Sequence, residues 1–196
     1  MKIVSISENK TVEKRIAVTP EMAKKYTSLG FKLSLQTGYG KDLGFKDDDY
    51  KSFGVDFLDN EKEIISNADI VVQLGLPDDE KLLLLKENQI LIGSLNTFSN
   101  KDKLEKLKTK KINCFSLELL PRITRAQSMD ILSSQANLAG YKAVIEAFKI
   151  YEKAIPMMMT AAGTIPAAKV LVVGAGVAGL QAIATAKRMG AIVFAT

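Results

Sequence analysis

The stretch from Lys169 to Leu180, KVLVVGAGVAGL, constrains the fold more than any other part of this chain. An apolar, strand-like run leads into glycines at 174, 176 and 179, which have the GxGxxG spacing of dinucleotide-binding βαβ units. The first glycine permits a tight turn, the second lets the backbone approach a pyrophosphate, and the third lets helix and strand pack closely. The spacing predicts a helix over about 177–189 and a second strand over 191–195.

The start of that helix, at Val177, is the expected phosphate site, because its N–H groups and positive dipole end attract anions. The glycine spacing alone is a weak signal, so an ordinary glycine-packed βα turn stays open. A membrane span over the uncharged run 170–186 fits poorly, because about 17 residues rich in Gly and Ala are marginal for a bilayer. The fingerprint also asks for an acidic residue after the second strand, and the sequence ends at Thr196, where that residue is expected.

Strand-like and helical runs alternate through the first 120 residues, which predicts a mostly parallel sheet covered on both faces. The expected strands are 2–6, 32–36, 55–58, 69–74, 89–95 and 112–117; the expected helices are 20–29, 47–53, 61–67, 79–86 and 100–110. The fold class is therefore α/β. We expect residues 1–120 to form the first lobe and residues 164–196 to begin a second, Rossmann-type lobe that is incomplete in this sequence.

Between the lobes, a polar segment at 121–133 precedes a long helix that we expect at 134–155, where apolar residues recur at intervals of three and four. Ligands of open α/β sheets lie beyond the carboxyl ends of the strands, so this segment is placed to line a cleft. The candidate side chains facing the nicotinamide end of a dinucleotide are Arg122, Gln127, Asp130 and Ser133. A capped helix start with solvated polar side chains is the alternative, and spacing alone does not decide between them.

The composition excludes several kinds of chemistry. The chain has no histidine, which removes a histidine base, a Ser-His-Asp triad and any histidine-ligated metal site, and we predict no metal. One cysteine, Cys114, makes no intrachain disulfide and is expected to be buried, in keeping with a reducing compartment. The lysines at 101–111 lack interleaved aromatic residues, which favours a solvated helix face over nucleic-acid binding. The methionines at 157–159 are expected to pack internally, and a hydrophobic lip near a ligand is the alternative.

Two runs carry a specific resemblance to a known family. They are PRITRAQSMDILSSQANLAGYKAV at 121–144 and PMMMTAAGTIPAAKVLVVGAGVAGLQAIATAKRMGA at 156–191. Together with residues 13–20, they closely resemble the NAD(H)-binding domain of proton-translocating NAD(P) transhydrogenases, the N-terminal part of the alpha subunit. The resemblance covers essentially the whole chain. Its specific part is 122–135, because the glycine motif is shared by many families.

The resemblance implies a fold of two Rossmann-like lobes with parallel sheets, the second incomplete here, joined by the long helix. It implies that Arg122, Gln127 and Asp130, with Ser133, hold the nicotinamide and its ribose, and that Gln127 helps place the ring against an NADP(H) nicotinamide on a separate domain. The expected cofactors are thus NAD(H), bound on Gly174, Gly176, Val177 and Gly179, and NADP(H) on a partner. Family members are about twice this length, so we expect the chain to be a fragment.

The closest rival family is alanine dehydrogenase, which shares the fold and the Arg15 region. Oxidising an amino acid requires removal of a proton as well as a hydride, so it needs a base. The positions that correspond to that family's lysine and histidine hold Gln73 and Asn96 here, and neither is a base. Hydride transfer between two nicotinamides needs only two rings held at about 3–3.5 Å, which suits this set of side chains.

The sequence therefore predicts the NAD(H)-binding part of a transhydrogenase, an enzyme that passes hydride from NADH to NADP⁺. Two alternatives remain: an amino-acid dehydrogenase of altered specificity, and a non-catalytic NAD-binding module. The expected partners are a second copy in a homodimer and the NADP-binding and membrane domains; nucleic acid and a direct membrane span are not expected. With no signal or transit peptide in view, we expect a cytoplasmic protein held at the inner face of the inner membrane by its partner subunits.

Overall fold

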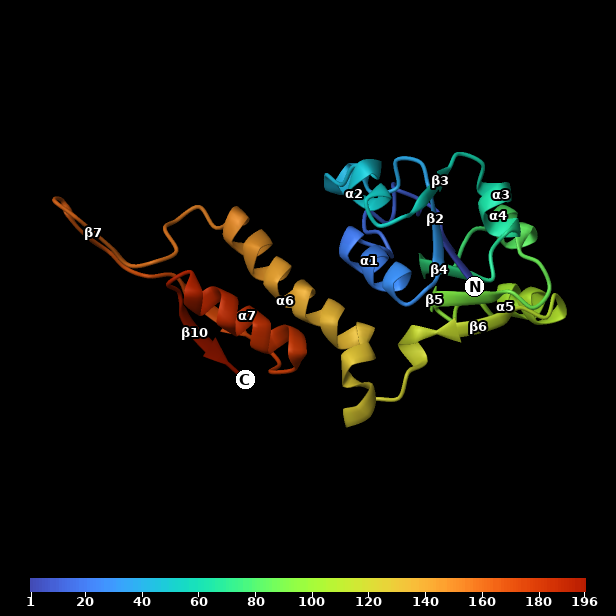
Figure 1. Ribbon diagram of the computed structural model, residues 1–196. Coiled ribbons are helices and arrows are strands. Elements are labelled where there is room, and N and C mark those ends of the chain that lie inside the picture. Colours follow the sequence, from blue (N-terminus) through green and yellow to red (C-terminus); the bar gives the residue numbers. More distant parts are fainter. The chain divides into compact units, whose positions relative to one another are not determined.

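The computed structural model describes all of residues 1–196, and the chain divides into two units, 1–121 and 122–196 (Figure 1). The strands of the first unit are β1 (Lys2–Ser5), β2 (Lys32–Gln36), β3 (Asp56–Leu58), β4 (Ile70–Gly75), β5 (Ile90–Ser94) and β6 (Asn113–Ser116). They form one parallel sheet in the order β3-β2-β1-β4-β5-β6. This is the doubly wound topology of a Rossmann-like lobe, with its switch point between β1 and β4.

The helices of the first unit lie between these strands. They are α1 (Pro20–Ser28), α2 (Asp47–Lys51), α3 (Glu61–Ser66), α4 (Asp79–Leu84) and α5 (Lys101–Thr109), with short 3₁₀ helices η1 (Lys41–Leu43) and η2 (Leu117–Leu119). Each expected strand and helix is present, with ends within two residues of the prediction. The start of α1 illustrates why the predicted ends agree with the structure. The Thr19 side chain accepts from the Met22 N–H, and Pro20 occupies the first turn, as the sequence signals for a helix start predict.

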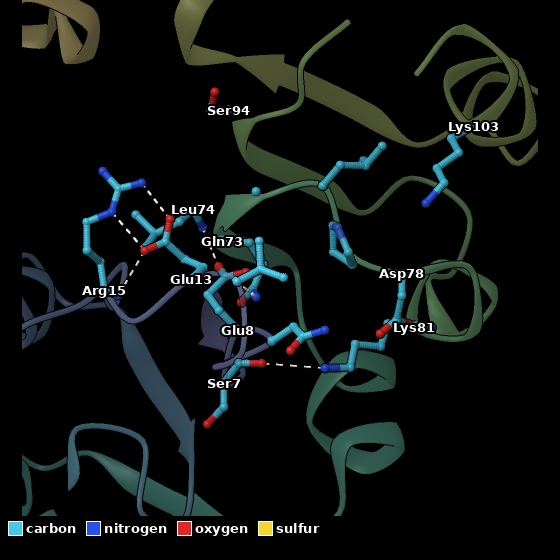
Figure 2. A pocket seen from close by; sticks show the side chains of 15 residues that line it. Ser7, Glu8, Glu13, Arg15, Gln73, Leu74, Asp78, Lys81, Ser94 and Lys103 are labelled. Atoms are coloured by element: carbon cyan, nitrogen blue, oxygen red, sulfur yellow. Dashed lines mark hydrogen bonds and ion pairs between the residues drawn. The ribbon is translucent and has the colours of Figure 1, made fainter. Parts of the chain in front are cut away.

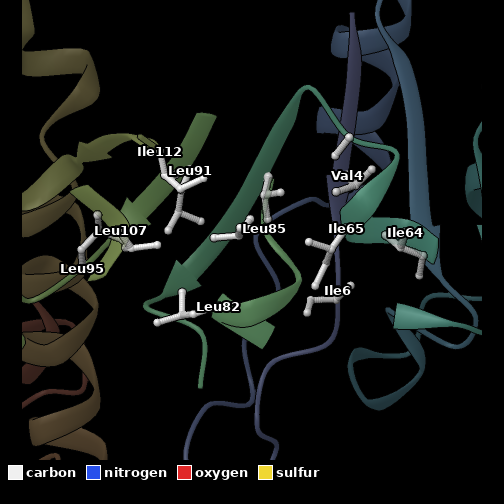
Figure 3. Close-up of a cluster of buried hydrophobic side chains, with 12 residues drawn as sticks. Val4, Ile6, Ile64, Ile65, Leu82, Leu85, Leu91, Leu95, Leu107 and Ile112 are labelled. Atoms are coloured by element: carbon white, nitrogen blue, oxygen red, sulfur yellow. The ribbon is translucent and has the colours of Figure 1, made fainter. Parts of the chain in front are cut away.

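Two clusters of buried apolar side chains fill the two faces of this sheet. Neighbouring residues on β1 divide between them, since Ile3 belongs to one cluster and Val4 to the other, and successive side chains on a strand point to opposite faces. Figure 3 shows the cluster of Val4, in which Ile65 of α3 lies beside Val4 of β1, and Leu91 of β5 lies beside Ile112. The expected α/β class with helices on both faces is confirmed.

The second unit contains two short sheets and two long helices. Its elements are η3 (Thr124–Met129), α6 (Ile131–Ile150), β7 (Met158–Thr160), β8 (Gly163–Ile165), β9 (Lys169–Val172), α7 (Val177–Arg188) and β10 (Ile192–Ala195). β9 and β10 pair in parallel, as the glycine motif predicts, and α7 connects them. α6 lies alongside α7 (Figure 1).

Three expectations for individual segments were wrong. α6 runs over Ile131–Ile150 rather than 134–155, because Asp130 caps its start and its first residue lies three before the expected one. Met157–Met159 do not pack internally: they enter the antiparallel hairpin β7–β8, where the Met159 side chain is 80% exposed. Cys114 is exposed, since it lies on β6 at the edge of the sheet.

No helix in the structure combines the length and apolar character that crossing a membrane requires.

Candidate functional site

The glycine turn between β9 and α7 has the shape that dinucleotide binding requires. Gly174 has φ +96°, a conformation that favours glycine. A Cβ on Gly179 would lie 1.8 Å from the Gly174 carbonyl oxygen, so the turn and the helix approach each other closely only because residue 179 lacks a side chain. At Gly176 a Cβ would meet nothing within 4 Å, which leaves open space beside the backbone at the helix start.

The N-terminus of α7 is free to bind an anion. Gly176 is the N-cap residue, and it brings no side chain to the N–H groups of Val177 and the residues that follow. An open space, uncapped N–H groups and the positive end of a 12-residue helix are what a pyrophosphate needs. The residues present therefore fit the phosphates of NAD(H).

The second group of predicted site residues surrounds the start of α6. Asp130 is its N-cap: Oδ1 accepts from the Ser133 N–H at 2.9 Å, and Oδ2 accepts from the Ser133 hydroxyl at 2.6 Å. Arg122 Nε lies 3.9 Å from Asp130 Oδ2. The hydroxyl and the backbone N–H of Ser133, and then the Arg122 charge, lower the pKa of Asp130, so its carboxylate is ionised at neutral pH.

The structure thus brings three of the four predicted nicotinamide-loop residues into contact. Part of this contact is the helix cap that we kept as an alternative, because Asp130 and Ser133 satisfy each other at the helix start. The fourth residue, Gln127, lies exposed in η3, and its carbonyl accepts from the Asp130 N–H at 3.3 Å. Its amide side chain is therefore available to a ligand, while the other three are pre-organised.

A separate cavity of about 480 Å³ lies in the first unit, at the carboxyl ends of β1, β4 and β5 (Figure 2). This is the switch point of the sheet, where open α/β folds bind ligands. Its wall includes Glu8, Glu13, Arg15, Gln73 and Lys81. The cavity is lined by both carboxylates and cations, and of these Glu13 and Arg15 form an ion pair with each other.

Buried hydrogen bonds fix Gln73 in this wall. Its Oε1 accepts from the Ser5 hydroxyl at 3.0 Å and from the Ile6 N–H at 2.9 Å, and its Nε2 donates to Glu8 Oε1 at 3.2 Å. Because the Ser5 hydroxyl has one proton and gives it to Gln73, the Tyr39 hydroxyl must be the donor in its 2.8 Å contact with Ser5. The Gln73 amide is therefore engaged by the protein itself.

Arg15 is likewise engaged. Its Nε donates to Glu13 Oε1 at 2.9 Å and its second guanidinium nitrogen reaches Glu13 Oε2, a two-point ion pair. Hydrogen bonding to Arg15 lowers the pKa of Glu13, so the carboxylate stays ionised beside the guanidinium. A ligand carboxylate at Arg15 would have to displace Glu13 from this pair.

Comparison with known proteins places the chain in a family. The model of the alanine dehydrogenase/PNT N-terminal domain matches residues 5–139, and that of the C-terminal domain of the same family matches residues 143–196. The chain belongs to the alanine dehydrogenase/PNT family. The resemblance drawn from the two sequence runs is confirmed.

Individual members of the alanine dehydrogenase/PNT family give the identity of this chain to two branches of that family. It is 46% identical to the first part of the NAD(P) transhydrogenase alpha subunit of Rhodospirillum rubrum over 100% of this chain and 52% of that protein, and 47% identical to its Rickettsia prowazekii counterpart over 98% and 51%. Alanine dehydrogenase of Methanococcus maripaludis is 28% identical over 94% of this chain and 50% of that protein. The chain spans about half the length of these relatives.

Solved structures of the same two kinds of enzyme are also similar to this chain. The transhydrogenase structure from Sinorhizobium meliloti superposes with a TM-score of 0.93 at 44% identity, covering 98% of this chain and 58% of that one. An L-alanine dehydrogenase structure superposes with a TM-score of 0.82 at 22% identity, covering 97% and 53%, and that likeness concerns the fold. The family fold is therefore shared by both branches, while sequence identity is higher with the transhydrogenases.

The sequence analysis did not identify several residues that the structure places near the candidate site on α6 and α7 or near the cavity of the first unit. It did not single out Asn137 and Gly140 on α6 or Gln181 on α7, although the two helices meet at these positions. An isolated glycine inside a helical repeat was the available signal, since it often marks a close packing contact. It also missed Tyr39 and Glu8, whose hydrogen bonds link distant segments and give no local pattern.

Burial of Glu8 gives the first prediction. Desolvation raises the pKa of this carboxyl, although Leu74 N–H donates to it at 2.6 Å. Because the folded state holds this proton more tightly, the free energy of unfolding falls as pH rises from the ordinary pKa of a glutamate through the raised value. Glu8→Gln should remove this fall and stabilise the protein at pH 7. Urea unfolding at several pH values between 4 and 8 measures this pH dependence of the free energy of unfolding.

The exposed Glu80→Gln is the control and should keep the wild-type pH dependence. The same pH dependence in Glu8→Gln as in the wild type would show that Glu8 is not the group responsible.

Loss of the Tyr39 hydroxyl gives the second prediction. This oxygen accepts from the N–H groups of Ala17 and Val18 at 2.9 and 3.2 Å, inside the core. Tyr39→Phe leaves these donors without their partner and should destabilise the protein by about 2 kcal/mol. The exposed Tyr141→Phe is the matched control and should change stability little. Equal unfolding midpoints in urea for the two variants would show that the hydroxyl contributes nothing.

Proposed function

We propose that this chain is the NAD(H)-binding part of a proton-translocating NAD(P)⁺ transhydrogenase, which transfers hydride from NADH to NADP⁺ bound on a partner domain. The observation that carries the proposal is the cluster of Arg122, Asp130 and Ser133 at the start of α6, the helix that packs beside the glycine turn of α7. Both halves of the proposed dinucleotide site belong to one unit of the chain, residues 122–196.

Each residue of the site has a role in this proposal. Gly174, Gly176, Val177 and Gly179 form the turn whose N–H groups bind the pyrophosphate. Arg122, Asp130 and Ser133 form a pre-organised polar surface for the nicotinamide and its ribose. Gln127, which is exposed, orients the ring toward the partner's nicotinamide. When bound, NADH supplies the hydride and becomes NAD⁺, while NADP⁺ accepts it and becomes NADPH.

The chemistry of this step explains why no general base is needed. A hydride carries its two electrons with it, so no proton leaves or enters at the two reacting carbons. The contribution of the protein is to hold two rings at about 3–3.5 Å with their reacting faces opposed. The side chains of the site, an amide, a guanidinium, a carboxylate and a hydroxyl, position a ligand and exchange no proton with it.

An amino-acid dehydrogenase is the second candidate, supported by the shared fold and the cavity beside Arg15. Three features weigh against it. Gln73 is held by Ser5, Ile6 and Glu8, Arg15 is paired with Glu13, and Asn96 stands after β5, where a base is needed. The guanidinium of Arg15 is therefore occupied by Glu13, and the Gln73 amide carries no charge with which to bind a substrate carboxylate.

We further propose partners and a location on the same basis. The names of the relatives describe one part of a subunit, which supports action of this chain with an NADP-binding domain and a membrane domain. We also propose that the chain acts as a homodimer. These partners would hold it at the cytoplasmic face of the inner membrane. Proton translocation would be carried out by the membrane domain and coupled to hydride transfer through the NADP-binding domain.

The experiment that tests the proposed function uses the complete complex that contains this chain. We expect NADH-dependent reduction of an NADP⁺ analogue whose reduced form absorbs at a separate wavelength, and no reduction of NAD⁺ with L-alanine. Reduction of NAD⁺ by L-alanine would identify an amino-acid dehydrogenase. Binding of NADH without transfer to the analogue would identify a non-catalytic NAD-binding module.

A further inference from the structure

The two helices that carry the predicted site cross at Gly140. A Cβ on this residue would lie 2.0 Å from the carbonyl oxygen of Ala178 and 3.0 Å from its Cα. All of the nearest atoms belong to the backbone of the first turn of α7, so no side chain can rotate out of the way. Gly140 is buried, and the two helix backbones approach there at a distance that leaves no room for a Cβ.

Polar side chains on the same faces join the helices beside this crossing. Asn137, one turn before Gly140, donates from Nδ2 to Gln181 Oε1 at 3.3 Å. Gln181 in turn donates from Nε2 to Thr185 Oγ1 at 3.2 Å, and the Thr185 hydroxyl donates to the Gln181 carbonyl at 2.8 Å. A backbone contact and a side-chain hydrogen bond therefore both fix the rotation and distance of α7 relative to α6.

The crossing lies between the two halves of the site. Asp130 is ten residues before Gly140 on α6, which corresponds to about 15 Å of helix. Ala178 is the second residue of α7, directly after the phosphate turn. Any change in spacing at Gly140 therefore moves the turn relative to the Arg122, Asp130 and Ser133 cluster, while each half keeps its own internal contacts.

We propose that Gly140, with the hydrogen bond from Asn137 to Gln181, is a positioning residue that sets the span between the pyrophosphate turn and the nicotinamide loop. The inference rests on the proposed function for its reaction, but its binding part needs only a dinucleotide. One ligand must reach both halves at once, so its affinity depends on their separation in the way that a bivalent ligand depends on its linker. A ligand that uses the turn alone does not sense the separation.

The test compares NADH with ADP, which offers the pyrophosphate without the nicotinamide, in the complete complex. Gly140→Ala adds one carbon that must push the helices apart by about an ångström. The dissociation constant of ADP should stay within about twofold of wild type, while that of NADH rises about tenfold. At saturating NADH, the rate of transfer to an NADP⁺ analogue should fall about 100-fold, because about 1 Å of misplacement has effects of this size.

Ala139→Ser is the matched control, since it adds one atom to the neighbouring, exposed position of α6 and should leave all three quantities unchanged. Equal weakening of ADP and NADH would reduce Gly140 to a structural role and overturn the inference, as would no change in either. If Gly140→Ala does not fold, Asn137→Ala replaces it in the test, because it adds no volume. A dissociation constant for NADH that rises about threefold, with that of ADP unchanged, supports the inference. Equal changes in both constants, or no change in either, overturn it. A wild-type complex that binds NADH but transfers no hydride would refute the proposed function, and the ADP and NADH constants would still decide the inference.

Discussion

Replacing Gly179 by alanine is expected to weaken NADH binding by about 100-fold and to lower the melting temperature. The new Cβ would lie 1.8 Å from the Gly174 carbonyl oxygen, a backbone atom that moves only if the turn opens. Opening the turn takes the N–H groups of α7 away from the position of the pyrophosphate. Overpacking of this kind costs about 1–3 kcal/mol in stability. Calorimetric titration with NADH and thermal unfolding measure the two effects.

Gly176→Ala separates binding from stability and serves as the comparison. A Cβ there meets nothing within 4 Å, so the melting temperature should stay at the wild-type value. The same Cβ fills the space through which a phosphate approaches the backbone, so NADH affinity should fall by about tenfold. NADH affinity at the wild-type level in Gly179→Ala would place the nucleotide elsewhere.

The second large effect is expected at Gln127. Substitution by Asn shortens the side chain by one methylene and draws the amide back from the ring by about an ångström. Hydride transfer at saturating NADH should slow by about 100-fold, because small errors in the placement of reacting atoms have large effects on rate. NADH affinity should change by less than about twofold, since Arg122, Asp130 and Ser133 keep their contacts.

Single-turnover mixing of the NADH-loaded complex with an NADP⁺ analogue measures the transfer rate. Ser134→Ala is the matched control: its exposed hydroxyl donates to the Ile131 carbonyl of α6. It should leave both the rate and the affinity unchanged. A Gln127→Asn complex that transfers hydride at the wild-type rate would remove Gln127 from its proposed role.

The first lobe could be predicted from the sequence because its signals are local. Alternating apolar runs, helix caps such as Thr19 and prolines at helix starts predict the elements one by one, and their alternation predicts that the strands run parallel. The hairpin β7–β8 was missed for the opposite reason. Its strands contain methionines and small residues, and the connecting Ala161-Ala162 lacks the Asn-Gly or Asp-Gly signal of a tight hairpin.

The candidate site was predictable in its residue types but not in its contacts. The glycine spacing and the polar run 122–133 pointed to the same residues that the structure brings to the starts of α7 and α6. The α6 start at Ile131 was signalled by Asp130, yet the apolar repeat placed it later. The pairing of Arg15 with Glu13 and the backbone contact at Gly140 depend on side-chain direction and helix crossing, which one sequence does not specify.

The most direct test of the proposed hydride transfer follows the hydrogen that leaves NADH. The complete complex is mixed with NADP⁺ and with NADH that carries deuterium on the transferred position of its nicotinamide C4, and the product NADPH is examined by mass spectrometry. Direct transfer between two rings predicts that all of the deuterium appears in NADPH and none in water. Deuterium released to water, or NADH that stays bound and unoxidised, would contradict the account.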